Sequence, residues 1–139
     1  MGTTDGEALG DSFSPRRLLK SETVYDGRIW DVVQDTFEFA PDAAPLVRDY
    51  IDHPGAVAVL VLNDADEVLM INQYRHPVRM NLWEIPAGLM DIEDEAPHLA
   101  AARELAEEAD LVAEDWAVLV DLFLSPGSSS EAIRIYLAR

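Results

Sequence analysis

The chain has 139 residues, 49% of them hydrophobic, which is enough for one modest domain with a hydrophobic core. Its net charge of −17 disfavours binding to long nucleic acids, because that binding needs many Lys and Arg contacts to phosphates. The sequence contains no cysteine, no signal-peptide pattern and no apolar run of the ~18 residues that a membrane span needs. We therefore expect a cytoplasmic protein with no disulfide and no membrane partner.

The first third of the chain is predicted to hold a tail and a small sheet. Residues 1–14 are rich in Gly, Ser, Thr and Asp and have little to bury, which predicts a disordered tail. Residues 15–52 then form an N-terminal antiparallel β region. Alternating apolar and polar residues predict its strands, and Asp26-Gly27 is a typical hairpin turn. These strands are expected at 18–25, 29–39 and 46–52.

Residues 53–139 are predicted to form the main α+β core. The nearly continuous apolar run 56–62 is typical of a buried central strand, and 67–74 is its expected hairpin partner across a turn at 63–66. An alanine-rich run at 99–109 predicts a helix. Residues 82–87 form a strand or loop in which Trp83 is expected in the core. Two further strands are expected at 116–124 and 132–138.

Three carboxylates follow one another at helical spacing in the alanine-rich run. Glu104, Glu107 and Glu108 stand at i, i+3 and i+4, so a helix places them on one face. Like charges at this spacing repel by roughly 0.2–0.5 kcal/mol per pair, and a cation would relieve that repulsion. Hard oxygen ligands suit Mg²⁺ or Mn²⁺ better than zinc. The alternative is an ordinary solvated helix in an acidic protein.

A longer pattern around these glutamates resembles the Nudix box. Seven residues separate Glu95 from Arg103, and the run Arg103-Glu104-Leu105-x-Glu107-Glu108-x-x-Leu111 follows. The pattern departs from the box in two places. Six residues, rather than five, separate Gly88 from Glu95, and Asp110 replaces the second glycine, which would cap the helix in a left-handed conformation. Asp adopts that conformation more readily than most residues do, so we expect intact chemistry.

The resemblance implies a fold as well as a motif. It implies a Nudix-type α/β/α sandwich with a mixed sheet, preceded by the N-terminal β region at 15–52. In similar enzymes that region is exchanged between the subunits of a homodimer. It also implies that the C-terminal part of the core is missing after Arg139, together with a loop that carries the general base.

Further segments resemble the ADP-ribose pyrophosphatase branch of this family. Pro126 lies fifteen residues beyond Leu111, and 73–77 and 82–88 look like characteristic segments of the branch. The implied reaction is metal-dependent hydrolysis of ADP-ribose to AMP and ribose 5-phosphate. Alternatives are hydrolysis of another nucleoside diphosphate derivative, such as a sugar nucleotide or dinucleoside polyphosphate, and a non-catalytic sensor that binds ADP-ribose.

The resemblance also implies roles for the box residues. Glu104 and Glu108 would bind the ion, expected to be Mg²⁺ with Mn²⁺ as an alternative, and Glu107 would share or support it. The backbone carbonyl of Ala87 is a further ligand. The predicted catalytic set is Glu107, Glu108 and Arg103, with Arg103 holding the carboxylates in place. Gly88 and Glu95 are expected to support the structure of the box.

Four residues outside the box are predicted to bind substrate. Arg75 and Arg48 are candidates for clamping phosphates, because a guanidinium meets phosphate with two parallel hydrogen bonds. Arg79 is a weaker third candidate. Trp30 could stack on adenine, although core packing is an equal alternative. Glu131 is expected at the terminal ribose or, alternatively, exposed on a strand. The three histidines are assigned no chemistry.

Overall fold

The computed structural model describes residues 10–139. Most of the predicted tail, residues 1–9, lies outside the described residues. Residues 10–16 are exposed and form neither helix nor strand. None of the helices between residues 10 and 139 is long and apolar enough to cross a membrane.

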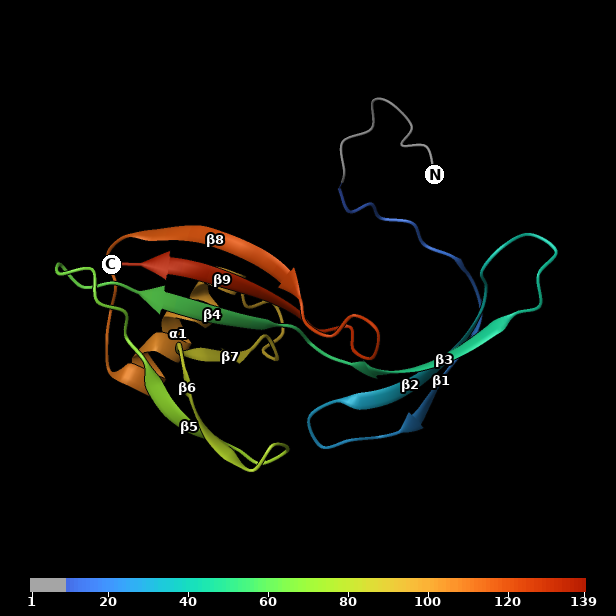
Figure 1. The fold of residues 1–139 in the computed structure, drawn as a ribbon, viewed down its shortest axis with the longest axis horizontal. Coiled ribbons are helices and arrows are strands. Elements are labelled where there is room, and N and C mark those ends of the chain that lie inside the picture. The colour runs from blue at the N-terminus through green and yellow to red at the C-terminus, as the bar shows by residue number, and fades with distance from the viewer. Residues whose placement is uncertain (1–9) are drawn as a thin grey trace, which may run out of the picture.

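The N-terminal β region is a three-stranded antiparallel sheet that extends away from the rest of the chain (Figure 1). Its strands are β1 (Arg17–Tyr25), β2 (Asp31–Glu38) and β3 (Leu46–Asp52), in the order β1-β2-β3. The three strands are confirmed, but β2 begins two residues later than predicted. The backbone N–H of Gly27 donates to the Asp31 carboxylate at 3.0 Å, which closes the turn before the strand starts.

The main sheet has four strands in the order β7-β4-β9-β8 (Figure 1). Strand β4 (Ala56–Val61) lies antiparallel to β7 (Ala87–Leu89) and parallel to β9 (Ala132–Ala138). Strand β8 (Trp116–Phe123) completes the sheet as the antiparallel neighbour of β9. This mixed sheet confirms the expected α+β class, and β4 is the buried central strand that its apolar run predicts.

The prediction that residues 67–74 pair with β4 along a hairpin was wrong. Residues 67–74 do not form a strand beside β4. The two segments are joined only next to the turn, by the isolated bridge between Leu62 and Val68 and by hydrogen bonds from Leu69 N–H to the Val61 carbonyl at 3.0 Å and from Asn63 N–H to the Glu67 carbonyl at 3.2 Å. The edges of β4 are instead taken by β7 and β9. Residues 71–74 of the predicted partner belong instead to β5 (Ile71–Arg75), which forms a separate hairpin with β6 (Met80–Glu84).

Trp83 is also not in the core, as its side chain lies on β6 and is 69% exposed in the described chain. The β5–β6 hairpin has only two strands and is not hydrogen-bonded to the main sheet. The face of this hairpin that carries Trp83 is therefore exposed. Alternation along β6 places Leu82 and Glu84 on the opposite side from Trp83.

Helix α1 (Pro97–Ala109) has clear signals at both ends. Pro97 stands at the start of the helix, where its missing N–H is not needed. The helix ends at Asp110, whose φ of 54° is left-handed and whose N–H bonds to the Ala106 carbonyl at 3.0 Å. The substituted cap position therefore adopts the conformation that the glycine of the box would adopt.

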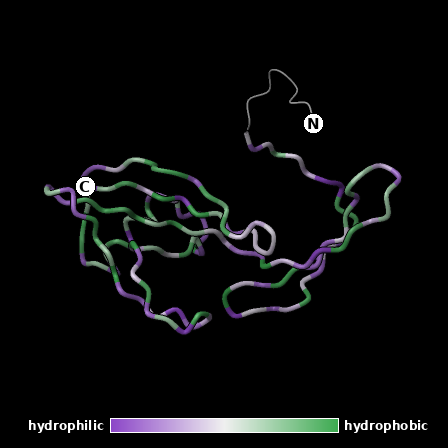
Figure 2. Tube along the Cα trace, in the orientation of Figure 1, coloured by the Kyte–Doolittle hydropathy of each residue, from purple (hydrophilic) through white to green (hydrophobic). Residues whose placement is uncertain are grey.

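Helix α1 packs on the main sheet and closes the core. It buries Ala100, Ala101 and Leu105 completely, and these pack with Val57 and Val59 of β4. The small alanines let the helix approach the sheet closely. Figure 2 shows the hydrophobic residues concentrated along the strands of the main sheet. This packing fixes the other face of α1, which carries the glutamates, beside β7.

Candidate metal and substrate site

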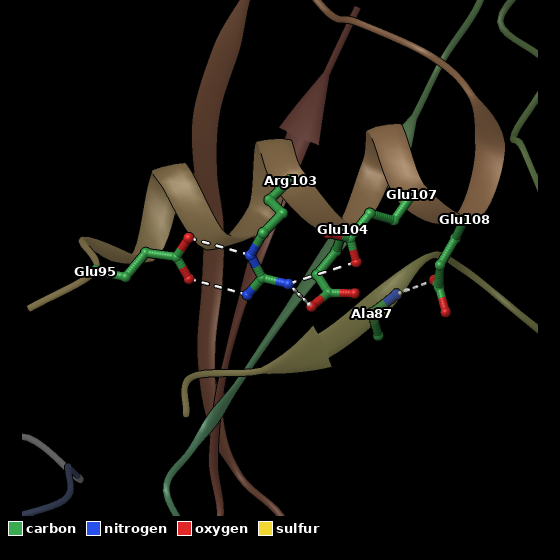
Figure 3. A network of polar contacts seen from close by, with 6 residues as sticks. All are labelled: Ala87, Glu95, Arg103, Glu104, Glu107 and Glu108. Atoms are coloured by element: carbon green, nitrogen blue, oxygen red, sulfur yellow. Dashed lines mark hydrogen bonds and ion pairs between the residues drawn. The ribbon is translucent and has the colours of Figure 1, made fainter. Parts of the chain in front are cut away.

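The site is organised by an ion pair between the loop before α1 and the helix itself. Arg103 donates from Nε to one Glu95 oxygen at 3.1 Å and from Nη2 to the other at 2.9 Å (Figure 3). The side chains are 26% and 15% exposed. These hydrogen bonds from Arg103 hold the pKa of Glu95 below its ordinary value. The pairing places Gly88–Glu95 against the helix in spite of the extra loop residue.

The same guanidinium contacts two of the three clustered glutamates. Its Nη1 lies 2.6 Å from a Glu104 oxygen and 3.6 Å from a Glu107 oxygen (Figure 3). Hydrogen bonds to Glu95 and Glu104 raise the pKa of Arg103 above its ordinary value, so it stays charged. Glu107 is largely exposed, whereas Glu104 is 13% exposed and faces the sheet.

Strand β7 meets the acidic face of α1 at Ala87 and Gly88. The Ala87 backbone N–H donates to Glu108 Oε2 at 3.0 Å. A Cβ at Gly88 would collide with the carboxyl group of Glu104, so glycine leaves the space that this side chain occupies. The sequence-predicted residues of the box are therefore brought together around β7, with Glu104 and Glu108 turned toward it (Figure 3).

These residues fit a hard divalent ion by their chemistry. Glu104, Glu107 and Glu108 offer carboxylate oxygens as metal ligands, and no histidine or cysteine side chain belongs to this group. Within residues 10–139, no three carboxylate or imidazole groups converge closely enough to form a finished metal site. The reason is visible in the contacts, since Glu104 is held by Arg103 and Glu108 by the Ala87 N–H.

A cleft of about 790 Å³ opens beside β7. Its volume is within the range of sites for small molecules. Ala87 and Gly88 line one part, next to the acidic face of α1. The other lining residues that bear on chemistry come from the N-terminal sheet, the β5–β6 hairpin and the loop before β9. These residues are Trp30, His53, Gln73, Arg75, Glu84 and Glu131.

Arg75 is the sequence-predicted arginine that the fold brings into the cleft. It pairs with Glu84, with Nη2 of Arg75 lying 2.6 Å from the carboxylate. Hydrogen bonding to Glu84 raises the pKa of Arg75, and the charges of Glu108 and Glu131 raise it further. Arg75 therefore lies in the electrostatic field of carboxylates from both the helix and the loop before β9.

The other two arginines are not brought to the cleft. Arg48 is exposed on β3, and its Nη1 donates to the neighbouring Val47 carbonyl at 2.8 Å. Arg79 lies exposed in the β5–β6 turn, where its own backbone φ is 56°. Neither residue lines the cleft in this chain.

Trp30 and Glu131 lie in the cleft on either side of a histidine. The Trp30 ring lies against His53 with 5.2 Å between ring centroids and a tilt of 30° between the ring planes, and Nε2 of His53 lies 3.8 Å from a Glu131 oxygen. Trp30 is 41% exposed, which excludes the core alternative. Glu131 is partly buried rather than an exposed strand residue.

Sequence reasoning missed Glu84 and His53. Glu84 could have been found, because alternation on the two strands of a hairpin places it on the same face as Arg75. His53 gave no such signal. Its partners Trp30 and Glu131 are distant along the chain, and only the tertiary structure brings them together.

Comparisons with known proteins identify a family and several relatives of this chain. The NUDIX domain family matches residues 52–138. An ADP-ribose pyrophosphatase of Mycobacterium tuberculosis is 45% identical over 120 residues, which cover 86% of this chain and 58% of that protein. A methanol dehydrogenase activator of Bacillus methanolicus is 34% identical over 88% of this chain and 65% of its own length. The chain therefore spans about three fifths of the length of these curated relatives.

A solved structure is similar as well. A crystal structure described as an ADP compounds hydrolase superposes with a TM-score of 0.75 at 26% sequence identity, covering 93% of this chain and 69% of that one. The alignment therefore extends well beyond the motif in α1.

Proposed function

The chain belongs to the NUDIX domain family, and on this premise we propose that it acts in the hydrolysis of the pyrophosphate bond of ADP-ribose to AMP and ribose 5-phosphate. One observation carries the proposal. Ala87 and Gly88, which contact the glutamates of α1, line the same cleft as Arg75, and this cleft also presents the aromatic ring of Trp30. These three groups match the chemistry of a charged diphosphate joined to a flat base.

The ion-binding residues are those of the Nudix box. Glu104 and Glu108, with the Ala87 carbonyl, would hold Mg²⁺, or Mn²⁺ in its place, and Glu107 would support it. When bound, the ion would neutralise the diphosphate, polarise it and lower the pKa of a bound water. Members of this family use divalent ions in general, and the oxygen-only donor set favours these two.

Arg103 acts through the carboxylates rather than on the substrate. Its paired hydrogen bonds to Glu95 fix the guanidinium, and the guanidinium in turn fixes Glu104. Residues that hydrogen-bond to metal ligands without binding the metal orient those ligands and tune their basicity. Arg103 and Glu95 are therefore positioning residues, while Glu107 and Glu108 are the proposed catalytic carboxylates.

Arg75 is the proposed phosphate clamp. In the described structure its partner is Glu84, and the substrate phosphate would compete for the same donors. Because the charges of Glu108 and Glu131 also act on this guanidinium, it stays protonated and able to counter diphosphate charge. Trp30 would stack on a flat ring and Glu131 would accept hydrogen bonds from sugar hydroxyls.

A substrate panel tests this proposal. Purified chain with Mg²⁺ is incubated with ADP-ribose, GDP-mannose and a dinucleoside polyphosphate, and the products are separated by chromatography. We expect AMP and ribose 5-phosphate from ADP-ribose at the highest kcat/KM. A higher kcat/KM on another compound would move the proposal to the alternative substrate class. Tight binding of ADP-ribose with no turnover, both by this chain and by a longer one that carries the expected general-base loop, would favour the sensor alternative.

A homodimer is the proposed assembly. The N-terminal sheet extends away from the core (Figure 1). It carries exposed apolar side chains, and such patches are typical of association surfaces. The exposed residues include Leu18, Val24, Tyr25, Phe39 and Val47. Light scattering coupled to size-exclusion chromatography would give twice the chain mass for a homodimer, and the chain mass itself for a monomer.

The cytoplasmic location stays a prediction from composition, to be tested by cell fractionation.

A further inference from the structure

The N-terminal sheet is joined to the main core by a hydrogen-bonded seam. The seam connects residues 51–53, at the end of β3, with residues 128–131, before β9. Ile51 N–H donates to the Ser128 carbonyl at 2.9 Å, and Ser130 N–H donates to the Ile51 carbonyl at 3.0 Å. The hydroxyl of Ser130 also accepts from the His53 N–H at 2.8 Å. These contacts fix where His53 and Glu131 lie.

The side chain of His53 is only 6% exposed and lies close to three neighbours, one of which it meets through a hydrogen bond. Its Nδ1 accepts from the Gly55 N–H at 3.0 Å. A neutral imidazole with an accepting Nδ1 carries its proton on Nε2, which faces a Glu131 oxygen at 3.8 Å. The flat face of the ring lies against Trp30 at an interplanar angle of 30°.

The contact with Gly55 locks the link between the two sheets. Gly55 has a φ of 94°, a conformation that glycine adopts without strain, and it connects β3 to β4 through Pro54. An imidazole that caps the Gly55 N–H holds this link in one shape. Trp30 and Glu131 both border the cleft, and each of them lies beside His53.

We propose that His53 is the positioning residue that holds Trp30 and Glu131 around one half of the cleft, where they bind the nucleoside part of a nucleoside diphosphate independently of its diphosphate. The inference rests on the proposed function and deepens it. The ring of Trp30 offers a stacking face. The Glu131 carboxylate, which the resemblance assigns to the terminal ribose, is placed here at the ribose diol of the nucleoside, because it shares His53 with Trp30. The diphosphate itself is left to Arg75 and α1.

Binding of two probes separates these halves. AMP carries the base, the diol and a phosphate but no pyrophosphate bond, whereas inorganic pyrophosphate has no nucleoside. Calorimetry with Mg²⁺ present gives the Kd of each. We expect His53→Ala to raise the Kd for AMP about tenfold, because one well-placed ring contact is lost. The Kd for pyrophosphate should change less than twofold. In hydrolysis of ADP-ribose, KM should rise while kcat is kept.

Two further variants protect the test against misfolding. His53→Asn can still accept from the Gly55 N–H but offers no ring to Trp30, so it should stay folded and lose AMP affinity like His53→Ala. His98→Ala is the matched control, because His98 is exposed at the start of α1. Thermal unfolding of every variant is recorded alongside.

A thermodynamic cycle tests whether His53 works through its neighbours. In a background of Trp30→Ala with Glu131→Gln, the His53→Ala change should cost AMP affinity less than twofold further. A full tenfold further loss would mean that His53 acts by itself and would overturn the positioning role.

The outcomes are distinct from those for the proposed function. Unchanged AMP affinity in folded His53→Ala and His53→Asn overturns this inference, and so does equal weakening of AMP and pyrophosphate. A wild-type chain that binds AMP but does not hydrolyse ADP-ribose refutes the proposed activity while the probe comparison still decides the role of His53. A loss of affinity for AMP but not for pyrophosphate in both His53→Ala and His53→Asn supports the inference.

Discussion

Arg103 meets Glu95 with two parallel hydrogen bonds, at 3.1 and 2.9 Å, and so ties helix α1 to the loop that precedes it. The remaining guanidinium nitrogen of Arg103 is thereby aimed at Glu104. The loop, the helix and the candidate metal ligand Glu104 form one connected unit. A change at Glu95 should therefore alter the affinity for the ion.

Replacement of Glu95 by glutamine should weaken ion binding without touching a ligand. Arg103 would lose its outer partner and turn further toward Glu104, competing with the cation. We expect Mn²⁺ affinity, followed by its electron paramagnetic resonance signal, to fall about 10–100-fold. Glu93→Gln is the control, because Glu93 is exposed in the same loop. Equal affinity in Glu95→Gln and wild type would remove Glu95 from the site.

The same ion pair should give acid-dependent stability. The pKa of Glu95 is lowered from 4.5 in the folded chain, so the unfolded chain binds the proton more readily. The contribution is present above pH 4.5 and is lost as pH falls through the lowered folded value. Urea unfolding above and below this pH should therefore show wild type losing more stability than Glu95→Gln. A parallel decline in both proteins would contradict the assignment.

Gly88→Ala should disturb chemistry more than stability. The new methyl group would displace the flexible end of Glu104, which moves at little cost to packing. With one candidate ligand displaced, kcat/KM with Mg²⁺ should fall about 10–100-fold. Gly127→Ala is the matched control, since nothing lies within 4 Å of the position of its added Cβ. The idea fails if both alanine variants keep full kcat/KM.

Arg75 and Arg48 can be separated by their effects on KM. Arg75→Ala removes a charged donor from the cleft and should raise KM about tenfold or more, because hydrogen bonds to charged groups contribute about 1.5–3 kcal/mol. Arg48→Ala should change KM less, because in this chain its side chain bonds to the Val47 carbonyl. Steady-state kinetics on both variants decides the matter, and the reverse ranking would restore Arg48 as the clamp.

Leu105 tests the packing that holds α1 against the sheet. Its side chain is fully buried in the cluster with Val57 and Val59. Leu105→Ala should lower the free energy of unfolding by about 2–5 kcal/mol, the usual cost of emptying such a site. Leu99→Ala, at a position 54% exposed on the same helix, should cost much less. Denaturant titration measures both, and equal losses would place Leu105 outside the core.

Local pattern determined much of this protein from sequence. The alanine-rich run and the spacing of Glu104, Glu107 and Glu108 were sufficient to predict the helix and its acidic face, because helical geometry relates neighbours three and four residues apart without any tertiary contact. The roles of Arg103 and Glu95, by contrast, followed from the resemblance to the Nudix box. The buried run of β4 and the three strands of the N-terminal sheet followed from hydrophobic periodicity in the same way.

Strand pairing and the composition of the cleft were decided only by the tertiary structure. Residues 67–74 have the pattern of a strand, yet β7 and β9 occupy the edges of β4, a competition between segments far apart in the chain. Likewise, Trp30, His53 and Glu131 meet only because the seam joins β3 to the loop before β9. Periodicity reports which face of an element is apolar, but it carries no information on which distant element covers that face.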